Sequence, residues 1–299
     1  MYFSSTQAAI LAGPQRCHRI HMRISRLLPS LVLVVAFSGC STLNVTSKQF
    51  IPKDNGKLAL LKKSAPDYQV DNIEFKHPDG AISRGVYIHK PDAQFTVLYF
   101  MGSGIRLDVA GGYFAKPFTE LNANIISYDY HDFGRSDAPE SAFGLAELEK
   151  ETLALYDHAR ATTQGRLVVH GHSFGSFVAA GLAGKRPLDA LVLEGTGTSA
   201  RAYVENQVPW FAKPFVQVNI DPELSSTDNR AALRAFQGPL LIMNGVNDVQ
   251  TPLANSRELF DSLAIPHKRF EAIRDAGHMN AMTKPEALAA YRSFTGSLN

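Results

Sequence analysis

The sequence is poor in cysteine and in net charge. Its 299 residues include two cysteines, Cys17 and Cys40, which excludes a disulfide scaffold and a cysteine-based metal or redox site in the folded domain. Charged residues make up 19%, and the formal net charge is +2. Residues 1–39 hold four arginines and no acid, and removing these four charges leaves −2 for the rest. A basic surface for nucleic acid is therefore excluded.

Motifs that hold phosphate or metal are also missing. The glycine-rich stretch Met101-Gly102-Ser103-Gly104 is not followed by Gly-Lys-Ser or Gly-Lys-Thr, so it is no phosphate-binding loop. No group of histidine, cysteine and aspartate has metal-ligand spacing, and we expect neither a metal nor a cofactor. The chain has no repeat and no low-complexity tract. With 45% hydrophobic residues, its length predicts one α/β domain rather than two.

The first 39 residues have the pattern of a secretory signal peptide. Arg23 and Arg26 form a basic start, residues 27–37 are mostly apolar, and Ser38-Gly39-Cys40 closes the segment with small residues. The apolar part is too short to span a bilayer stably. Met22 begins a signal of normal proportions by itself, so the start of translation stays open.

The end of this segment, Phe37-Ser38-Gly39-Cys40, resembles the lipobox of bacterial lipoproteins. The resemblance implies that Cys40 is diacylated and becomes the first mature residue. Ser41 in place of aspartate implies sorting to the outer membrane, on its periplasmic side. An ordinary secretory signal and an uncut membrane anchor are the alternatives. We expect residues 40–69 to be a tether and N-terminal extension, in which the polar run 41–48 is a spacer.

From residue 70 to 299, strand and helix patterns alternate. The turn His77-Pro78-Asp79-Gly80 separates two alternating segments and predicts an antiparallel hairpin. The expected strands are 70–76, 81–90, 95–101, 124–128, a run from 167, 188–194, 239–244 and 267–273, and the expected helices are 110–122, 145–161, one directly after Ser173, one from 253 and one from 285. These β–α units predict a mostly parallel, doubly wound sheet. Residues 196–230 break the rhythm and predict a small cap, whose aromatic residues either line an acyl pocket or form the cap's own core.

A Gly-x-Ser-x-Gly turn, Gly171-His172-Ser173-Phe174-Gly175, lies between the run from 167 and an alanine-rich helix. This context predicts a nucleophile elbow, in which the serine hydroxyl is exposed on a strained strand-to-helix turn. Gly171 and Gly175 are expected where two backbone segments approach too closely for a Cβ atom. A chance turn of glycine and serine is the alternative.

A serine nucleophile needs a base, and the base needs an orienting acid. In such a sheet the chain order is serine, acid, histidine, each at the carboxyl end of a strand. Asp248 and His278 follow the expected strands 239–244 and 267–273 and fit this order. Asp248 could instead be only a turn former, and Glu194 is then the substitute acid. His278 could likewise be only a loop residue. Asp275 is expected to shape the loop before His278.

The oxyanion hole is expected from two backbone N–H groups, those of Phe174 and of Ser103 in the loop after strand 95–101. The alternative for Ser103 is a glycine-rich turn without a catalytic part. His170 and His172 flank the elbow, and we expect them to pack or to donate hydrogen bonds rather than to take part in catalysis.

These residues give the chain, from about residue 70 onward, a resemblance to α/β-hydrolase-fold serine hydrolases of the monoacylglycerol-lipase, carboxylesterase and protein-depalmitoylase kind. The matching segments are Leu98–Gly102, Tyr128–Ser136, Gly171–Gly175, Asn244–Asp248 and Gly277-His278. By resemblance they are the oxyanion strand, a structural turn, the elbow, the acid loop and the base loop. Met101 stands where relatives usually have histidine, so a hydrogen bond near the oxyanion loop is lost or replaced.

The sequence thus predicts hydrolysis of an ester or thioester through an acyl-enzyme on Ser173, with His278 as base and Asp248 as acid. A monomer anchored by lipid in the bacterial envelope and acting on a small ester or acyl compound is expected. A serine peptidase or aminopeptidase of the same fold is the first alternative. A non-catalytic envelope lipoprotein that serves as a binding module is the second.

Overall fold

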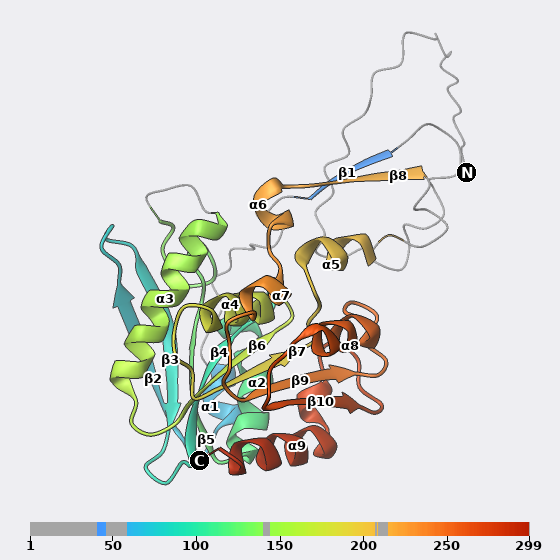
Figure 1. Cartoon of the computed structure of the whole chain (residues 1–299). Helices are drawn as coiled ribbons and strands as arrows, with labels where there is room; N and C mark the ends of the chain where they lie inside the picture. The colour runs from blue at the N-terminus through green and yellow to red at the C-terminus, as the bar shows by residue number, and fades with distance from the viewer. Residues whose placement is uncertain (1–40, 46–58, 140–143, 207, 209–214, 299) are drawn as a thin grey trace, which may run out of the picture.

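The computed structural model describes residues 41–45, 59–139, 144–206, 208 and 215–298 (Figure 1). The predicted signal peptide at 1–39 and the predicted lipidation site Cys40 lie outside these residues. Within the described ranges, no helix is both long enough and apolar enough to cross a membrane.

The centre of the molecule is an eight-stranded sheet in the order β10-β9-β7-β6-β4-β5-β3-β2. Its strands are β2 (Gln69–Lys76), β3 (Ile82–His89), β4 (Phe95–Phe100), β5 (Ala123–Tyr128), β6 (Leu167–His172), β7 (Ala190–Glu194), β9 (Leu240–Gly245) and β10 (Lys268–Ile273). Strand β3 runs antiparallel to both β2 and β5, and the other pairs are parallel. The prediction of a mostly parallel sheet entered through an antiparallel hairpin is confirmed.

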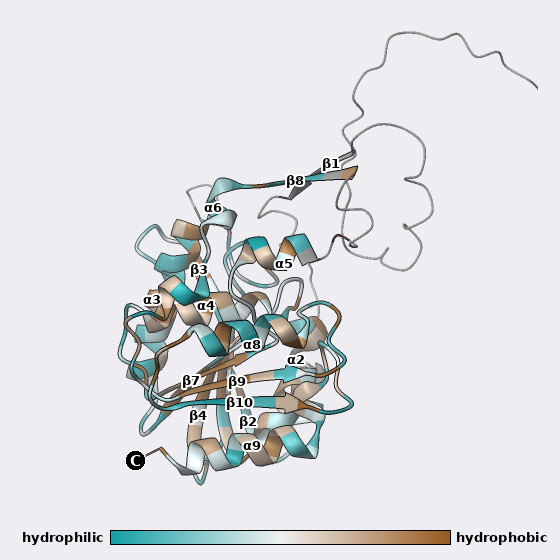
Figure 2. Ribbon diagram, turned by 45° about the vertical axis from the view of Figure 1, so that its right-hand side comes forward, coloured by the Kyte–Doolittle hydropathy of each residue, from teal (hydrophilic) through white to brown (hydrophobic). Residues whose placement is uncertain are grey.

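Helices cover both faces of this sheet (Figures 1 and 2). One face carries α1 (Ala59–Ser64), α2 (Leu107–Glu120) and α9 (Pro285–Gly296), and the other carries α3 (Leu145–Thr162), α4 (Phe174–Ala183), α7 (Asn229–Ala232) and α8 (Leu253–Ser262). Successive residues of β4 alternate between the two layers: Val97 and Tyr99 pack with the first set, and Leu98 and Phe100 with the second. Because both faces are covered, every residue of β4 is buried and the strand reads as a continuous apolar run.

The insert expected at 196–230 contains α5 (Ala200–Asn206), β8 (Val216–Ile220), α6 (Pro222–Ser225) and α7. Val218 and Ile220 of β8 pack against Ala200 and Val204 of α5, so the insert has a small apolar cluster of its own. Figure 1 shows these elements above the carboxyl ends of the central strands.

The N-terminal segment is more structured than its sequence suggests. Residues expected to be a spacer form strand β1 (Ser41–Val45), which pairs in parallel with β8 over its full length. Helix α1 lies in a stretch without a clear pattern, yet Leu61 is fully buried against α2. Both elements are too short for a periodic signal and are stabilised by partners far away in the chain.

Candidate active site

The Gly-x-Ser-x-Gly turn joins β6 to α4. Ser173 has φ +53° and ψ −119°, a backbone conformation that residues other than glycine rarely adopt. A Cβ atom on Gly171 would overlap the carbonyl oxygen of Gly175, and one on Gly175 would overlap that of Phe100. The two glycines therefore lie where backbone segments meet, as the elbow prediction requires.

The structure brings Ser173, Asp248 and His278 together from three separate loops at the carboxyl ends of strands. His278 Nε2 lies 2.9 Å from Ser173 Oγ, and His278 Nδ1 lies 2.8 Å from Asp248 Oδ2. All three side chains are buried; even His278, the most accessible, is only 9% exposed. The arrangement is the one expected of a nucleophile, a base and an orienting acid.

The protonation pattern of this triad follows from its partners. Burial alone would raise the pKa of Asp248, but the hydrogen bond and charge of His278, together with hydrogen bonds from Thr251, lower it. An ionised carboxylate only accepts hydrogen bonds, so the ring proton of His278 lies on Nδ1, and this N–H donates a hydrogen bond to Asp248. The lone pair of Nε2 then faces the Ser173 hydroxyl, which is the tautomer that a general base needs.

Asp248 forms a turn as well as facing the histidine. Its Oδ1 atom accepts hydrogen bonds from the backbone N–H groups of Gln250 and Thr251, at 2.9 and 2.8 Å. Its Oδ2 atom accepts from His278. Asp248 is therefore not only a turn former, because Oδ1 holds the turn while Oδ2 faces His278.

Thr251 is a member of the site that the sequence did not single out. Its hydroxyl donates to Asp248 Oδ2 at 2.7 Å and lies 3.1 Å from His278 Nδ1. The sequence Thr251-Pro252 predicts a helix cap followed by a first-turn proline. This prediction is wrong, because Pro252 is itself the N-cap of α8 and no side chain caps the helix; the threonine hydroxyl bonds to Asp248 instead.

The predicted oxyanion donors lie beside the nucleophile. Phe174 is the first residue of α4, and Ser103 lines one pocket together with Ser173 and Phe174. The hydroxyl of Tyr130 donates to the Met101 carbonyl at 3.0 Å, which ties down the end of β4 before this loop. The bond is made to the backbone of Met101 and not to its side chain. The assignment of the oxyanion donors stays a prediction.

The other candidates at the elbow have structural partners. Glu194 does not face His278; its Oε2 atom accepts a hydrogen bond of 3.2 Å from His170 Nε2. Burial alone would raise the pKa of Glu194, but the hydrogen bond from His170 and the charge of His172 outweigh it and lower the pKa. His172 Nε2 donates to the backbone carbonyl of His278 at 2.9 Å and so supports the base loop.

A pocket opens at Ser173. It is lined mainly by apolar side chains from α4 and α5, and its lining residues are Ser103, Ser173, Phe174, Phe177, Ala200, Tyr203, Val204 and Thr227. We call it the acyl pocket. Residues of the insert therefore both line this pocket and pack within the insert, so the two interpretations of its apolar residues do not exclude each other. Trp210 and its neighbours at 209–214 lie outside the described residues.

A second pocket lies on the α2 side of the elbow. Its lining is mainly aromatic and aliphatic and includes Tyr99, Tyr113, Phe114 and Phe118, with Met279 directly after His278. The elbow thus has apolar pockets on two sides.

Three side chains that could hold a metal ion meet in space away from the triad, although their spacing in the sequence gives no metal motif. His77, His131 and Glu151 are buried and bring their ligand atoms within 4.8 Å of one another. Burial lowers the pKa of His77 to about 4 and raises that of Glu151 to about 8. None of the three belongs to the triad or contacts it through a hydrogen bond among the described residues.

Comparison with solved structures identifies the fold. The esterase Pf2001 of Pyrococcus furiosus has a TM-score of 0.63 to this chain and 17% sequence identity, covering 83% of this chain and 96% of that chain. At this identity the likeness concerns the fold alone, and it confirms the α/β-hydrolase fold predicted from the motifs.

Curated proteins match most of the chain at low sequence identity. The chain is 24% identical over 273 residues to the uncharacterized protein YfhR of Escherichia coli O157:H7, covering 88% of this chain and 90% of YfhR. It is 22% identical over 207 residues to human alpha/beta hydrolase domain-containing protein 17B, covering 68% of this chain and 67% of that protein.

Residues 145–295, which make up half of the chain, match the model of the prolyl oligopeptidase family. This range contains Ser173, Asp248 and His278. The chain is therefore a hydrolase of the α/β-hydrolase fold and belongs to the prolyl oligopeptidase family.

Proposed function

We propose that this protein is a serine hydrolase that cleaves a carboxylic ester or thioester through an acyl-enzyme intermediate. The observation that carries the proposal is the continuous line of hydrogen bonds from Ser173 Oγ through His278 to Asp248 Oδ2, with distances of 2.9 and 2.8 Å. The strained backbone of Ser173 supports it, because strain of this kind is kept at functional sites.

In the acylation step, Ser173 Oγ attacks the substrate carbonyl carbon and gives its proton to His278 Nε2. Asp248 stabilises the imidazolium that forms. The N–H groups of Phe174 and Ser103 would hold the oxyanion of the tetrahedral intermediate. When this intermediate collapses, the C–O or C–S bond breaks, and the leaving alcohol or thiol takes the proton from His278.

In the deacylation step, a water molecule gives a proton to His278 Nε2 and attacks the acyl carbon. The ester bond to Ser173 breaks, Ser173 Oγ recovers the proton, and a carboxylic acid leaves. The acyl pocket supports an apolar acyl group, because its walls on α4 and α5 are mainly aliphatic and aromatic.

We also propose that the mature protein is a monomer anchored through a lipid on Cys40, on the periplasmic side of the outer membrane of a bacterium. The lipobox-like segment 37–40 supports this location. The test is to replace Cys40 by serine: incorporation of labelled fatty acid should stop, and the protein should leave the membrane fraction. Unchanged labelling would contradict lipidation at this residue.

A peptidase is the second candidate function, and the match to the prolyl oligopeptidase family favours it. The same triad cleaves amides when the site protonates an amine leaving group. A panel of p-nitrophenyl esters of rising acyl length, acyl thioesters and aminoacyl p-nitroanilides separates the two. We expect kcat/KM for esters or thioesters to exceed that for the amides.

The first experiment is labelling with a fluorophosphonate probe, which reacts with activated serines. The parent protein should be labelled and the Ser173→Ala variant should not, with both folded as judged by circular dichroism. Equal labelling of both, or of neither, would reject the hydrolase mechanism. The second of these outcomes would favour the non-catalytic binding module.

A further inference from the structure

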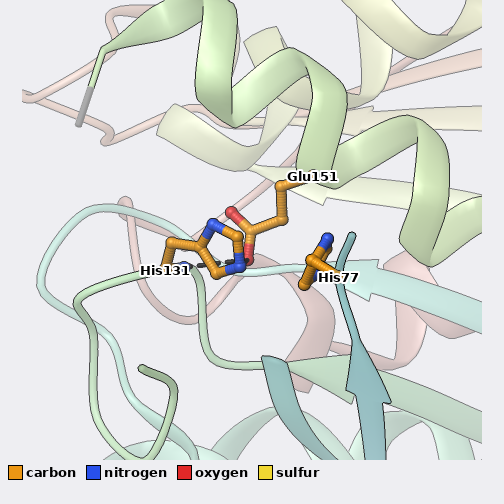
Figure 3. Close-up of side chains that lie close together, drawn as sticks. All are labelled: His77, His131 and Glu151. Atoms are coloured by element: carbon orange, nitrogen blue, oxygen red, sulfur yellow. Dashed lines mark hydrogen bonds and ion pairs between the residues drawn. The ribbon is translucent and has the colours of Figure 1, made fainter. Parts of the chain in front are cut away.

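Three buried side chains from three separate elements converge beside α3. His77 directly follows β2, His131 lies in the loop after β5, and Glu151 belongs to α3. Figure 3 shows the Glu151 side chain reaching down from the helix to the His131 ring, with His77 beside them. The two imidazole rings pack edge to face, with their centroids 4.3 Å apart. One ligand atom from each residue lies within 4.8 Å of those from the other two.

These polar groups are buried without enough partners. The side chains of Glu151 and His131 are 0% and 5% exposed. Within the part of the chain that the structure describes, neither ring nitrogen of His131 has a hydrogen-bond partner, and neither does Glu151 Oε2. Burying such groups unpaired is costly, so structures normally supply a partner. A bound cation would give these unpaired atoms a partner.

The carboxylate is held by hydrogen bonds on one oxygen only. Glu151 Oε1 accepts from the Ser83 hydroxyl and from the His131 backbone N–H, both at 2.8 Å. Ser83 Oγ also lies 2.8 Å from His77 Nε2. This network fixes the orientation of the carboxylate and leaves Oε2 available, as hydrogen bonds around a metal ligand commonly do.

No basic side chain neutralises the cluster. Among the described residues, the only ion-pair partner of Glu151 is His131, at 3.7 Å. The neighbouring charges that act on His131 are acidic and come from Asp79, Glu147 and Asp137. The nearby Arg84 pairs with Glu74 and Asp137 instead. Burial outweighs these charges and lowers the pKa of His131, so the imidazole is held neutral and keeps the lone pair that a metal ligand needs.

We propose that His77, His131 and Glu151 bind a divalent transition-metal ion of the Zn²⁺ type. Two imidazoles and one carboxylate are a common zinc ligand set, whereas Mg²⁺ and Ca²⁺ prefer oxygen ligands alone. A water molecule or the Ser83 hydroxyl would complete four ligands. The metal would link the β2–β3 hairpin, the loop after β5 and α3, and so stabilise the folded domain rather than take part in hydrolysis.

The test is metal binding by the whole purified protein, carrying an affinity tag without histidines and stripped with a chelator. Isothermal titration with ZnCl₂ and elemental analysis after dialysis should give one zinc ion per chain. The Co²⁺-loaded protein should show the visible absorption bands of a tetrahedral site. At 100 times Kd, Zn²⁺ should raise Tm by about 5–10 °C.

Variants locate the site. Glu151→Gln keeps the shape of the side chain, and both it and His131→Phe should weaken Zn²⁺ binding at least 100-fold. His267→Gln, which removes an exposed histidine before β10, is the matched control and should bind like the parent.

Absence of stoichiometric Zn²⁺ or Co²⁺ binding to the parent overturns the proposal and leaves a purely hydrogen-bonded cluster. Binding that is unchanged in Glu151→Gln or His131→Phe also overturns it, because the metal then lies elsewhere. If these variants do not fold, the stoichiometry and cobalt spectrum of the parent decide. None of these measurements depends on hydrolase activity.

Discussion

The hydroxyl of Thr251 donates a 2.7 Å hydrogen bond to Asp248 Oδ2, the same oxygen that faces His278 Nδ1. Thr251 therefore positions the acid and the base together without contacting Ser173 directly. Replacing Thr251 by valine keeps its shape and removes this donor. We expect kcat to fall about 10-fold, as for a lost hydrogen bond to a charged group, with little change in KM. Thr251→Ser keeps the donor and should retain most of the activity; equal loss in both variants would contradict the positioning role.

Asp248→Asn tests the acid assignment. The amide would donate to His278 Nδ1 and force the proton onto Nε2, where it blocks proton transfer from Ser173. The corresponding change in serine proteases lowers kcat by about 10⁴. We expect a loss on the order of 10³–10⁴ in ester turnover and a similar slowing of fluorophosphonate labelling. Activity within about 10-fold of the parent would point back to Glu194 as the acid.

Ser173→Gly should make the protein more stable while removing its activity. The positive φ of Ser173 costs on the order of 1–3 kcal/mol in residues other than glycine, whereas glycine adopts it freely. We expect the free energy of unfolding in urea to rise by about 1 kcal/mol. Ser173→Ala is the matched control, because it also lacks the hydroxyl but keeps the strain. A glycine variant no more stable than the alanine variant would show that the turn is not strained.

Glu194→Gln tests whether the buried Glu194, which pairs with His170, is ionised, through the pH dependence of the stability. Because the pKa of Glu194 is lowered in the folded state, its ionised carboxylate stabilises the fold above the unfolded pKa of about 4.5. This contribution is lost as the pH falls through the lower folded pKa. At pH 7 the variant should be less stable by about 1–3 kcal/mol. The difference should shrink as the pH is lowered below 4.5, measured by urea unfolding of both proteins. A difference that does not change with pH would argue against an ionised Glu194.

Ala200→Phe tests the acyl pocket. Ala200 begins α5 and lines the pocket beside Ser173, so a phenyl ring there would fill space that a long acyl chain needs. We expect kcat/KM for octanoyl and longer p-nitrophenyl esters to fall at least 10-fold, while that for the acetyl ester stays within 3-fold. Ala202→Phe, on the same helix but not in the pocket lining, is the control. An equal loss for all chain lengths would mean that acyl groups bind elsewhere.

The elbow and its partners could be predicted because their signals are local. A strand, a glycine-flanked serine and a helix follow one another directly at Ser173, and Asp248 and His278 each follow an apolar run. Parallel strands then bring these loops to one edge of the sheet. Glu194 also ends a strand, so sequence order could not exclude it as the acid; the side chain of His170 on the neighbouring strand does so.

Other features depend on contacts that no local pattern records. His77, His131 and Glu151 are separated by 54 and 20 positions, and they meet only because the hairpin packs beside α3. Strand β1 has five residues and a partner near residue 218, so neither its length nor its composition distinguishes it from a spacer. The sequence Thr251-Pro252 predicts a helix start, and nothing in that pattern indicates the hydrogen bond from Thr251 to Asp248.

The pairing of β1 with β8 changes what an anchor at Cys40 would hold. Ser41, the residue directly after Cys40, pairs with Val216 of the insert, so no flexible linker separates Cys40 from the insert. Strand β8 packs on α5, and α5 lines the acyl pocket. Under the proposed lipidation, the lipid on Cys40 would therefore hold the insert over the active site, rather than the opposite side of the domain, at the membrane surface. A long-chain substrate could then pass from the leaflet to Ser173 without crossing much water.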